Sequence, residues 1–214
     1  MAERDRFRRP ARKLKQEKRF LVVVEGKVTE WEYLEGVKRS RRMKSVEVRI
    51  EHEYTDPIGI VNHAKRIKDA ARKVDPFDEV WCVFDVEAKI TQMARPGLTD
   101  AIHAAEQAGV KCAISNPCFE VWLYWHCAIQ NAPIDSDAAQ RRCIELGIAQ
   151  AGRGKHLRDT DSLIAVGYQA AKIRAMEMEQ THDRNGAIKP EDRNPSSGLY
   201  LLIDAIYGAF PPRE

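Results

Sequence analysis

Residues 20–24, Phe-Leu-Val-Val-Val, form a short continuous run of apolar and mostly β-branched side chains. A strand covered on both faces has this pattern, whereas a half-exposed strand alternates between apolar and polar residues. The run therefore predicts a central strand of a parallel sheet, which ends at Glu25 and Gly26.

The segment after this strand has the spacing of an amphipathic helix. Trp31, Leu34 and Val37 recur at three-residue steps, which places them on one helical face. Thr29 and Glu32 match a capping box, with Thr29 as N-cap and Glu32 at position N3. Strand, tight turn and helix are therefore predicted to follow one another within about twenty residues.

Strand-like and helix-like patterns continue to alternate as far as about residue 130. Further strands are predicted at 46–50, 80–84 and 110–114. Further helices are predicted at 60–74 and 99–107, and a third is predicted to open with Asn116 as N-cap and Pro117 at N1. This βαβαβαβα order indicates an α/β fold, with a mainly parallel sheet and helices on both faces.

The remainder of the chain has helical patterns, near residues 137–149, 161–179 and 197–207. We expect a small helical extension here rather than an independent domain. The predicted organisation is a basic arm over residues 1–19, an α/β core over 20–130, and a helical extension over 131–214 packed on that core.

The composition of the 214 residues indicates a soluble protein with one substantial core. Charged residues make up 31% of the chain, the mean hydropathy is -0.50, and no apolar run approaches the length of a membrane span. The five cysteines are odd in number, show no CxxC pair and lie in apolar segments. They are interpreted as reduced core residues, and the expected location is the cytoplasm.

Positive charge is concentrated at the N-terminus. Residues 1–19 carry a net charge of +6, and the rest of the chain carries -3. A basic arm without apolar periodicity is expected to be disordered when free and to fit phosphate or another acidic surface. The alternative is a solvated tail that only aids solubility.

Acidic side chains follow two of the predicted strands directly. Glu25 ends the first strand, and Asp85 and Glu87 end the third. Because ligands of open parallel sheets bind beyond the carboxyl ends of the strands, we expect these carboxylates to converge if the two strands are neighbours. Alternation along the strand would place Asp85 and Glu87 on the same side. Grouped carboxylate oxygens suit Mg²⁺ or Mn²⁺; the alternative for each acid is a helix cap or a solvated position.

Several other residues are candidates for site or core roles. Glu120 lies in the first turn of the helix predicted after Asn116, on the same rim of the sheet, although an acid there is also favourable for the helix dipole alone. His126 is expected to be packed rather than catalytic. The four tryptophans have spacings that favour core positions over base stacking: Trp31, Trp81, Trp122 and Trp125.

The segment Phe20–Gly26 with Thr29-Glu30 after it, and Val83–Glu87, resemble the two signature segments of Toprim domains, which occur in topoisomerases, primases and OLD-family nucleases. More narrowly, the chain resembles the RloB-like family, which is encoded near restriction and phage-defence genes. The resemblance covers about residues 18–208 and rests on four segments: Glu25–Glu30, Asp56-Pro57, Ser115–Leu123 and Asn194–Ser197.

The resemblance implies roles for individual residues. Glu25 resembles the Toprim glutamate, which acts as a general acid or base or as a metal ligand. Asp85 and Glu87 resemble the Asp-x-Asp metal-binding pair, although Glu87 is one methylene longer than that pattern requires. Gly26 would let the backbone approach phosphate closely. Apart from the resemblance, the position of Glu120 on the rim makes it a candidate for a second ion, and four basic residues are candidates to contact phosphate or nucleic acid: Lys27, Arg41, Arg42 and Lys155.

Three functions are compatible with these features. The first is a Toprim-like nuclease that depends on Mg²⁺ or Mn²⁺ and hydrolyses phosphodiesters of RNA, for example tRNA, or DNA in bacterial antiphage defence or abortive infection. The second is a non-catalytic module that binds nucleic acid or another defence-system protein. The third and weakest is a receiver-like phosphoacceptor, which the Glu-Gly at the first strand does not support. No membrane partner is expected.

Overall fold

In the computed structural model of this protein, residues 18–40, 46–50, 56–87, 96–152 and 156–209 are described. Residues 1–17 of the basic arm predicted over 1–19, and the candidate phosphate-binding residues Arg41, Arg42 and Lys155, lie outside these ranges. Arg19, at the end of that arm, forms an ion pair with Asp75 at 3.0 Å, and its backbone N–H donates to Asp78 at 2.7 Å. Among the described helices, none combines the length and apolar character that a membrane crossing requires.

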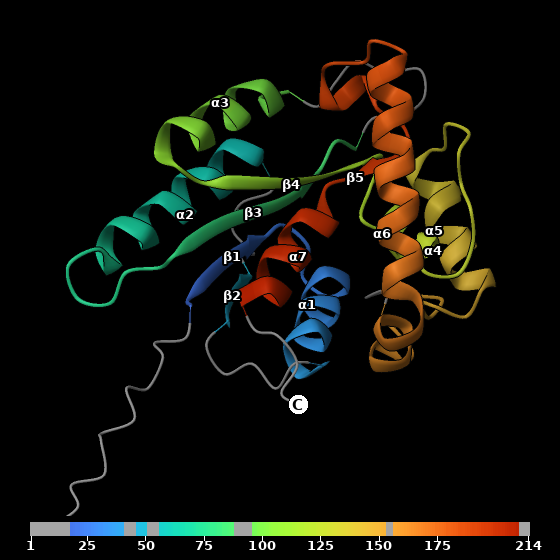
Figure 1. Cartoon of the computed structure of the whole chain (residues 1–214), viewed down its shortest axis with the longest axis horizontal. Helices are drawn as coiled ribbons and strands as arrows, with labels where there is room; N and C mark the ends of the chain where they lie inside the picture. The colour runs from blue at the N-terminus through green and yellow to red at the C-terminus, as the bar shows by residue number, and fades with distance from the viewer. Residues whose placement is uncertain (1–17, 41–45, 51–55, 88–95, 153–155, 210–214) are drawn as a thin grey trace, which may run out of the picture.

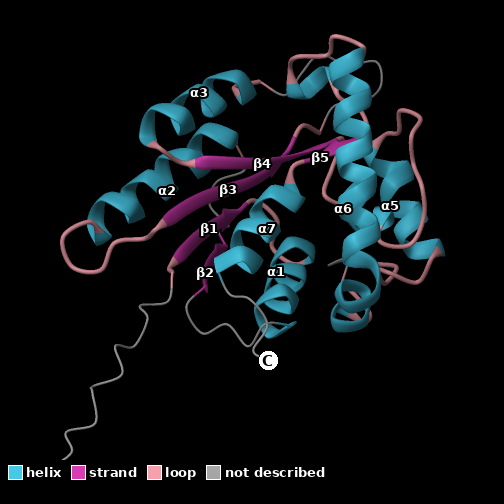
Figure 2. Cartoon of the chain, in the orientation of Figure 1, coloured by secondary structure: helices cyan, strands magenta, loops and turns pink. Residues whose placement is uncertain are grey.

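Five strands of the described residues form one sheet in the order β2-β1-β3-β4-β5 (Figures 1 and 2). They are β1 (Phe20–Val24), β2 (Val46–Ile50), β3 (Glu79–Asp85), β4 (Lys111–Asn116) and β5 (Ser196–Ser197). The first four are parallel, as predicted, and β5 is antiparallel to β4. β1 lies between β2 and β3, so the strands that end in Glu25 and Asp85 are neighbours.

Helices cover both faces of the sheet, and the side chains of β1 and β3 alternate between two hydrophobic clusters. Leu21 and Val23 pack with residues of α2 (Pro57–Ala71) and α3 (Leu98–Ala108). On the opposite face, Val22 and its alternate neighbours pack with α1 and α7, which lie on that side of the sheet in Figure 1. α1 comprises Thr29–Ser40 and α7 comprises Leu199–Ala209.

The C-terminal part of the chain is helical, as predicted, and shares the core of the sheet. The remaining helices are α4 (Glu120–Trp125), α5 (Ser136–Glu145), α6 (Thr160–Arg184) and a short 3-10 turn at Pro190–Asp192. Buried residues of all these α-helices belong to the same hydrophobic cluster as β1. The sequence pattern missed β5, which this part of the chain adds to the sheet beside β4.

The prediction that Asn116 is an N-cap was wrong. Asn116 is the last residue of β4, and α4 begins four residues later at Glu120. The Asn116 carboxamide is fully buried, and its Nδ2 donates hydrogen bonds to the carbonyls of Pro190 at 2.8 Å and Glu191 at 3.2 Å. It therefore holds the segment before β5 rather than the start of a helix.

Two core assignments also need correction. Trp31 is 40% exposed, while Tyr33 on the same helix is fully buried; the other three tryptophans are in the core as expected. Cys127 is exposed and Cys112 is partly exposed, although all five cysteines are free thiols. In both cases the three-dimensional packing, and not the local apolar pattern, determines which side chains are covered.

Glu32 has a long-range role that the capping-box pattern did not reveal. Its carboxylate accepts a hydrogen bond from the backbone N–H of Leu157 at 2.7 Å and contacts His156 Nδ1 at 2.5 Å. The second contact is an ion pair when His156 is protonated. Glu32 therefore connects α1 to the segment that precedes α6.

Candidate functional site

A cavity of about 300 Å³ lies at the carboxyl ends of β1 and β3. The structure brings Glu25, Asp85 and Glu87 together there, and adds Glu120 and Glu30 to the same wall. The other lining residues come from the loop after β1, the start of α1, the turn before α4 and the start of α5: Gly26, Lys27, Val28, Thr29, Cys118, Ser136 and Gln140. The cavity is where a parallel sheet of this kind places a ligand site.

The sheet itself positions the first two carboxylates. The backbone N–H of Glu25 donates to the carbonyl of Val83 at 3.2 Å, so Glu25 continues the pairing of β1 with β3. Asp85 is the last residue of β3 and is paired in register with Ser115 of β4. Both side chains therefore start from backbone that is held on a rigid element.

Glu87 lines the cavity, but the backbone conformation that places it there is not the predicted extended strand. β3 ends at Asp85, and Glu87 has φ of 52°, in the left-handed region that a non-glycine residue rarely occupies. Its N–H donates to the carbonyl of Pro117 at 2.9 Å, which keeps the chain beside the end of β4. Strand alternation therefore does not extend to Glu87, although its carboxylate lines the same cavity as Asp85.

The environment of Asp85 strongly disfavours its charged form. Burial is the largest cause that raises its pKa well above the usual value, and the nearby carboxylates of Glu30 and Glu120 raise it further. The N–H of Phe119 donates to Asp85 Oδ2 at 3.1 Å and opposes this effect by stabilising the carboxylate. The cavity thus concentrates negative charge that a bound cation would offset.

Glu120 lies in the first turn of a helix, as predicted, and its side chain is only 6% exposed. Its backbone carbonyl accepts a hydrogen bond from Cys143 Sγ at 3.3 Å, which connects α4 to α5. Cys118 lies next to it in the cavity wall. Burial and the charges of Glu120 and Asp85 raise the pKa of the Cys118 thiol, so it stays protonated and is a poor nucleophile.

Gly26 and Lys27 are the predicted phosphate-binding residues that the structure describes in the cavity wall. A Cβ at Gly26 would lie 1.8 Å from Glu30 Oε2, so the glycine leaves room for the Glu30 carboxyl group. Lys27 is exposed and brings a basic side chain to the five carboxylates of the cavity. The group that lies close to Gly26 is thus the Glu30 carboxyl group of the protein itself, whereas a phosphate was expected there.

The sequence analysis did not assign Glu30, Cys118, Ser136 or Gln140 to the site. The sequence could have indicated Glu30, because it lies at the start of the helix predicted directly after the Glu-Gly turn. Ser136 and Gln140 are four apart on α5 and so share one helical face. Their approach to β1 depends on the irregular segment between α4 and α5, which has no pattern that could have placed them.

The donor atoms of this wall are carboxylate oxygens, the ligand type that Mg²⁺ and Mn²⁺ prefer. Within the part of the chain that the structure describes, no three His, Cys, Asp or Glu side chains already have the mutual spacing for one metal ion. The chemistry of the donors and the crowding of their charges fit a divalent cation.

The fold and the cavity define an α/β protein with an acidic site at the carboxyl edge of a mainly parallel sheet. The family model described as RloB-like protein matches residues 20–206 of the 214. The chain therefore belongs to the RloB-like family. No curated protein and no solved structure gives a significant match to it.

Proposed function

We propose that this protein is a divalent-metal-dependent nuclease of the Toprim type, which hydrolyses phosphodiester bonds of RNA or DNA in bacterial antiphage defence. The observation that carries the proposal is the convergence of Glu25, Asp85 and Glu87 in one cavity at the ends of adjacent parallel strands. The Toprim resemblance of the two strand ends supports the same assignment.

Glu25, Asp85 and Glu87 are the residues that would hold Mg²⁺ or Mn²⁺, and Glu120 would serve a second ion. When bound, such an ion supplies an activated water and neutralises charge on the scissile phosphate. Burial raises the pKa of Asp85, and the nearby carboxylates of Glu30 and Glu120 raise it further. The crowded negative charge supports this role, because a bound cation would offset it.

The protein's own residues orient the reacting groups. The N–H of Phe119 donates to Oδ2 of Asp85 and so orients its carboxylate in the cavity wall. Glu25, which is held by its backbone on β3, is placed to accept or donate a proton as a general base or acid. Lys27 lies at the cavity wall, where its charge would attract a phosphate group.

We further propose that basic residues outside the described ranges attract nucleic acid without reading its sequence. Residues 1–17 of the arm, together with Arg41, Arg42 and Lys155, would supply this attraction. Binding of this kind weakens steeply as salt increases, because it depends on release of counterions from the phosphates. The expected location of the protein is the cytoplasm, where such substrates occur.

The proposal is tested by incubating the protein with tRNA, single-stranded DNA and duplex DNA in Mg²⁺ or Mn²⁺. Wild type is compared with Glu25→Gln, Asp85→Asn and, as a matched control, Glu106→Gln on an exposed position of α3. Loss of cleavage in the first two variants and full cleavage by the third is the expected result. Equal cleavage by all four proteins would contradict the proposal.

The second candidate is a non-catalytic module that binds nucleic acid or another defence protein through this cavity. One observation favours it. Among the described residues, no three His, Cys, Asp or Glu side chains lie close enough together to bind one metal ion. Tight binding of tRNA or DNA by wild type, with no cleavage in either metal, would support this candidate over the nuclease.

A further inference from the structure

The outer edge of β4 is only partly covered by β5. β5 is two residues long and pairs with Ser115 and Asn116 alone. One further hydrogen bond runs from the N–H of Gly198 to the carbonyl of Ile114, at 2.9 Å, before the chain enters α7. The remaining part of β4, from Lys111 to Ala113, therefore extends beyond the end of β5.

The direction of the backbone groups along β4 follows from two hydrogen bonds. The carbonyl oxygen of Ser115 accepts a hydrogen bond from the N–H of Val86, which directly follows β3. The backbone groups of Ser115 therefore point toward β3, inside the sheet. The carbonyl of Ile114 accepts from Gly198 and faces outward. Because backbone groups alternate in direction along a strand, the N–H and C=O of Cys112 also face the outer edge.

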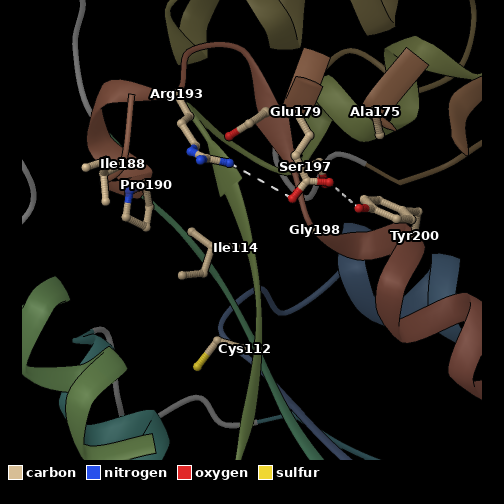
Figure 3. A pocket seen from close by; sticks show the side chains of 11 residues that line it. Cys112, Ile114, Ala175, Glu179, Ile188, Pro190, Arg193, Ser197, Gly198 and Tyr200 are labelled. Atoms are coloured by element: carbon tan, nitrogen blue, oxygen red, sulfur yellow. Dashed lines mark hydrogen bonds and ion pairs between the residues drawn. The ribbon is translucent and has the colours of Figure 1, made fainter. Parts of the chain in front are cut away.

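A pocket of about 320 Å³ lies beside this edge, apart from the acidic cavity (Figure 3). The side chains of Cys112 and Ile114 point to the same side of β4 in that view, with Ile188 and Pro190 across from them. The remaining lining residues come from α6, the segment around β5 and the start of α7: Ala175, Glu179, Arg193, Ser196, Ser197, Gly198 and Tyr200.

The charged groups of the pocket are largely occupied by one another. Tyr200 donates its hydroxyl hydrogen to Glu179, and Arg193 Nη1 lies 4.0 Å from Glu179 Oε1. Arg193 also contacts Asp183 at 2.5 Å and donates to the carbonyl of Ala187 at 2.9 Å. These contacts hold the polar wall in place and leave the apolar side chains for a ligand.

Ile188 is the most informative of these apolar residues. It lines the pocket and is 85% exposed. An exposed aliphatic side chain that lines a pocket beside outward-facing strand backbone is what binding by strand addition requires. In that mode, backbone hydrogen bonds supply affinity and pockets for alternate side chains supply specificity.

We propose that this edge binds an extended peptide segment of a partner protein. The segment adds as a strand beside residues 111–113 of β4, past the end of β5. It exchanges hydrogen bonds with the backbone of Cys112 and places a β-branched or other apolar side chain against Ile114, Ile188 and Pro190. This inference is independent of the nuclease proposal, because it uses none of the residues of the acidic cavity.

A second copy of this chain fits the edge less well than a single extended segment. Two copies that paired β4 with β4 in antiparallel orientation around Cys112 would bring residues 115 and 116 of one copy opposite residues 109 and 108 of the other. β5 already occupies that edge at residues 115 and 116. It would overlap the opposing strand, whereas a peptide without flanking structure meets no such obstacle.

The experiment selects peptides from a random twelve-residue phage-displayed library on the immobilised full-length protein. The best peptide is then synthesised with a fluorescent label, and its dissociation constant is measured by anisotropy. We expect alternating apolar residues in the selected peptides. We also expect at least tenfold weaker binding to Ile188→Asp and unchanged binding to Val74→Asp, a matched change at a residue 90% exposed beyond the end of α2.

Hydrogen exchange then distinguishes strand addition from other binding. Saturating peptide should slow exchange of the Cys112 amide at least tenfold and leave the Val80 amide of the central strand β3 unchanged. Failure to select any binder, equal binding to Ile188→Asp, or an unprotected Cys112 amide would each overturn the proposal. Ile188 is exposed, so the variant keeps the fold, and a melting curve verifies this. A dimer of the free protein that Ile188→Asp dissociates would instead show that a second copy occupies the edge.

Discussion

The backbone N–H of Phe119 donates a hydrogen bond to Asp85 Oδ2 over 3.1 Å. This contact joins the end of β3 to the turn before α4 and orients the carboxylate at the centre of the acidic cavity. It also favours the charged form of Asp85. The balance between this hydrogen bond and the surrounding negative charge makes Asp85 a sensitive position for mutation.

Asp85→Asn is expected to abolish metal-dependent cleavage while leaving the free energy of unfolding in metal-free buffer unchanged or slightly higher. Asparagine keeps an oxygen that accepts from Phe119 but removes the charge that Glu30 and Glu120 repel. Asp85→Ala is the matched comparison, because it leaves the Phe119 N–H without this partner and should lose about 1 kcal/mol. Urea denaturation measures both; a large loss in Asp85→Asn would show that the charge is structural.

Substitutions of Glu87 separate backbone strain from loss of the carboxylate. Its φ of 52° favours glycine, which has no Cβ to clash. Glu87→Gly and Glu87→Ala both remove the carboxylate, yet the glycine variant should be more stable by about 1 kcal/mol. Thermal or chemical denaturation of the two variants gives this difference directly. Equal stabilities would mean that the turn relaxes when Glu87 is replaced.

Gly167 allows α6 to approach the end of α4. A Cβ at this position would lie 2.6 Å from His126 Cβ and 2.8 Å from the His126 carbonyl oxygen. Gly167→Ala should therefore lower the free energy of unfolding by about 1–3 kcal/mol, although alanine is the better helix former. Gly208→Ala on α7, where a Cβ would meet nothing within 4 Å, is the control. It should be neutral or stabilising by up to about 1 kcal/mol.

His126 makes stability depend on pH. Its Nδ1 lies 2.9 Å from the carbonyl of Trp122, its Nε2 lies 3.0 Å from the hydroxyl of Tyr33, and burial lowers its pKa to about 4. Protonation favours the unfolded state, where the pKa is the ordinary value of about 6.5. The stability contribution of neutral His126 is complete above pH 6.5 and is lost as the pH falls toward 4, by up to about 3 kcal/mol.

The measurement is urea denaturation between pH 7.5 and pH 4, comparing wild type with His126→Gln. The variant is expected to start from lower stability and to show a shallower decline with acid, because it cannot take up this proton. His103→Gln, on an exposed side chain of α3, should follow the wild-type slope. Parallel curves for wild type and His126→Gln would contradict the assignment.

The sequence by itself determined the parallel strands and the acids that follow them. Residues 20–24 and 80–84 are almost wholly apolar, and such runs are stable only where both faces are covered. The carboxyl ends of parallel strands meet at one edge, so Glu25 and Asp85 were predicted to converge if their strands were neighbours, and the order β2-β1-β3 in the structure meets that condition. Membership of the RloB-like family was also evident from motifs that are local in the chain.

The tertiary structure decided what no local pattern encodes. Asn116 reads as a helix cap, but its partners are carbonyls more than seventy residues away. Ser136 and Gln140 reach the acidic cavity only because α5 packs beside α4. β5 pairs with β4 although it is only two residues long. Periodicity reports which face of an element is buried, whereas the partner of that face depends on contacts between segments that are distant in sequence.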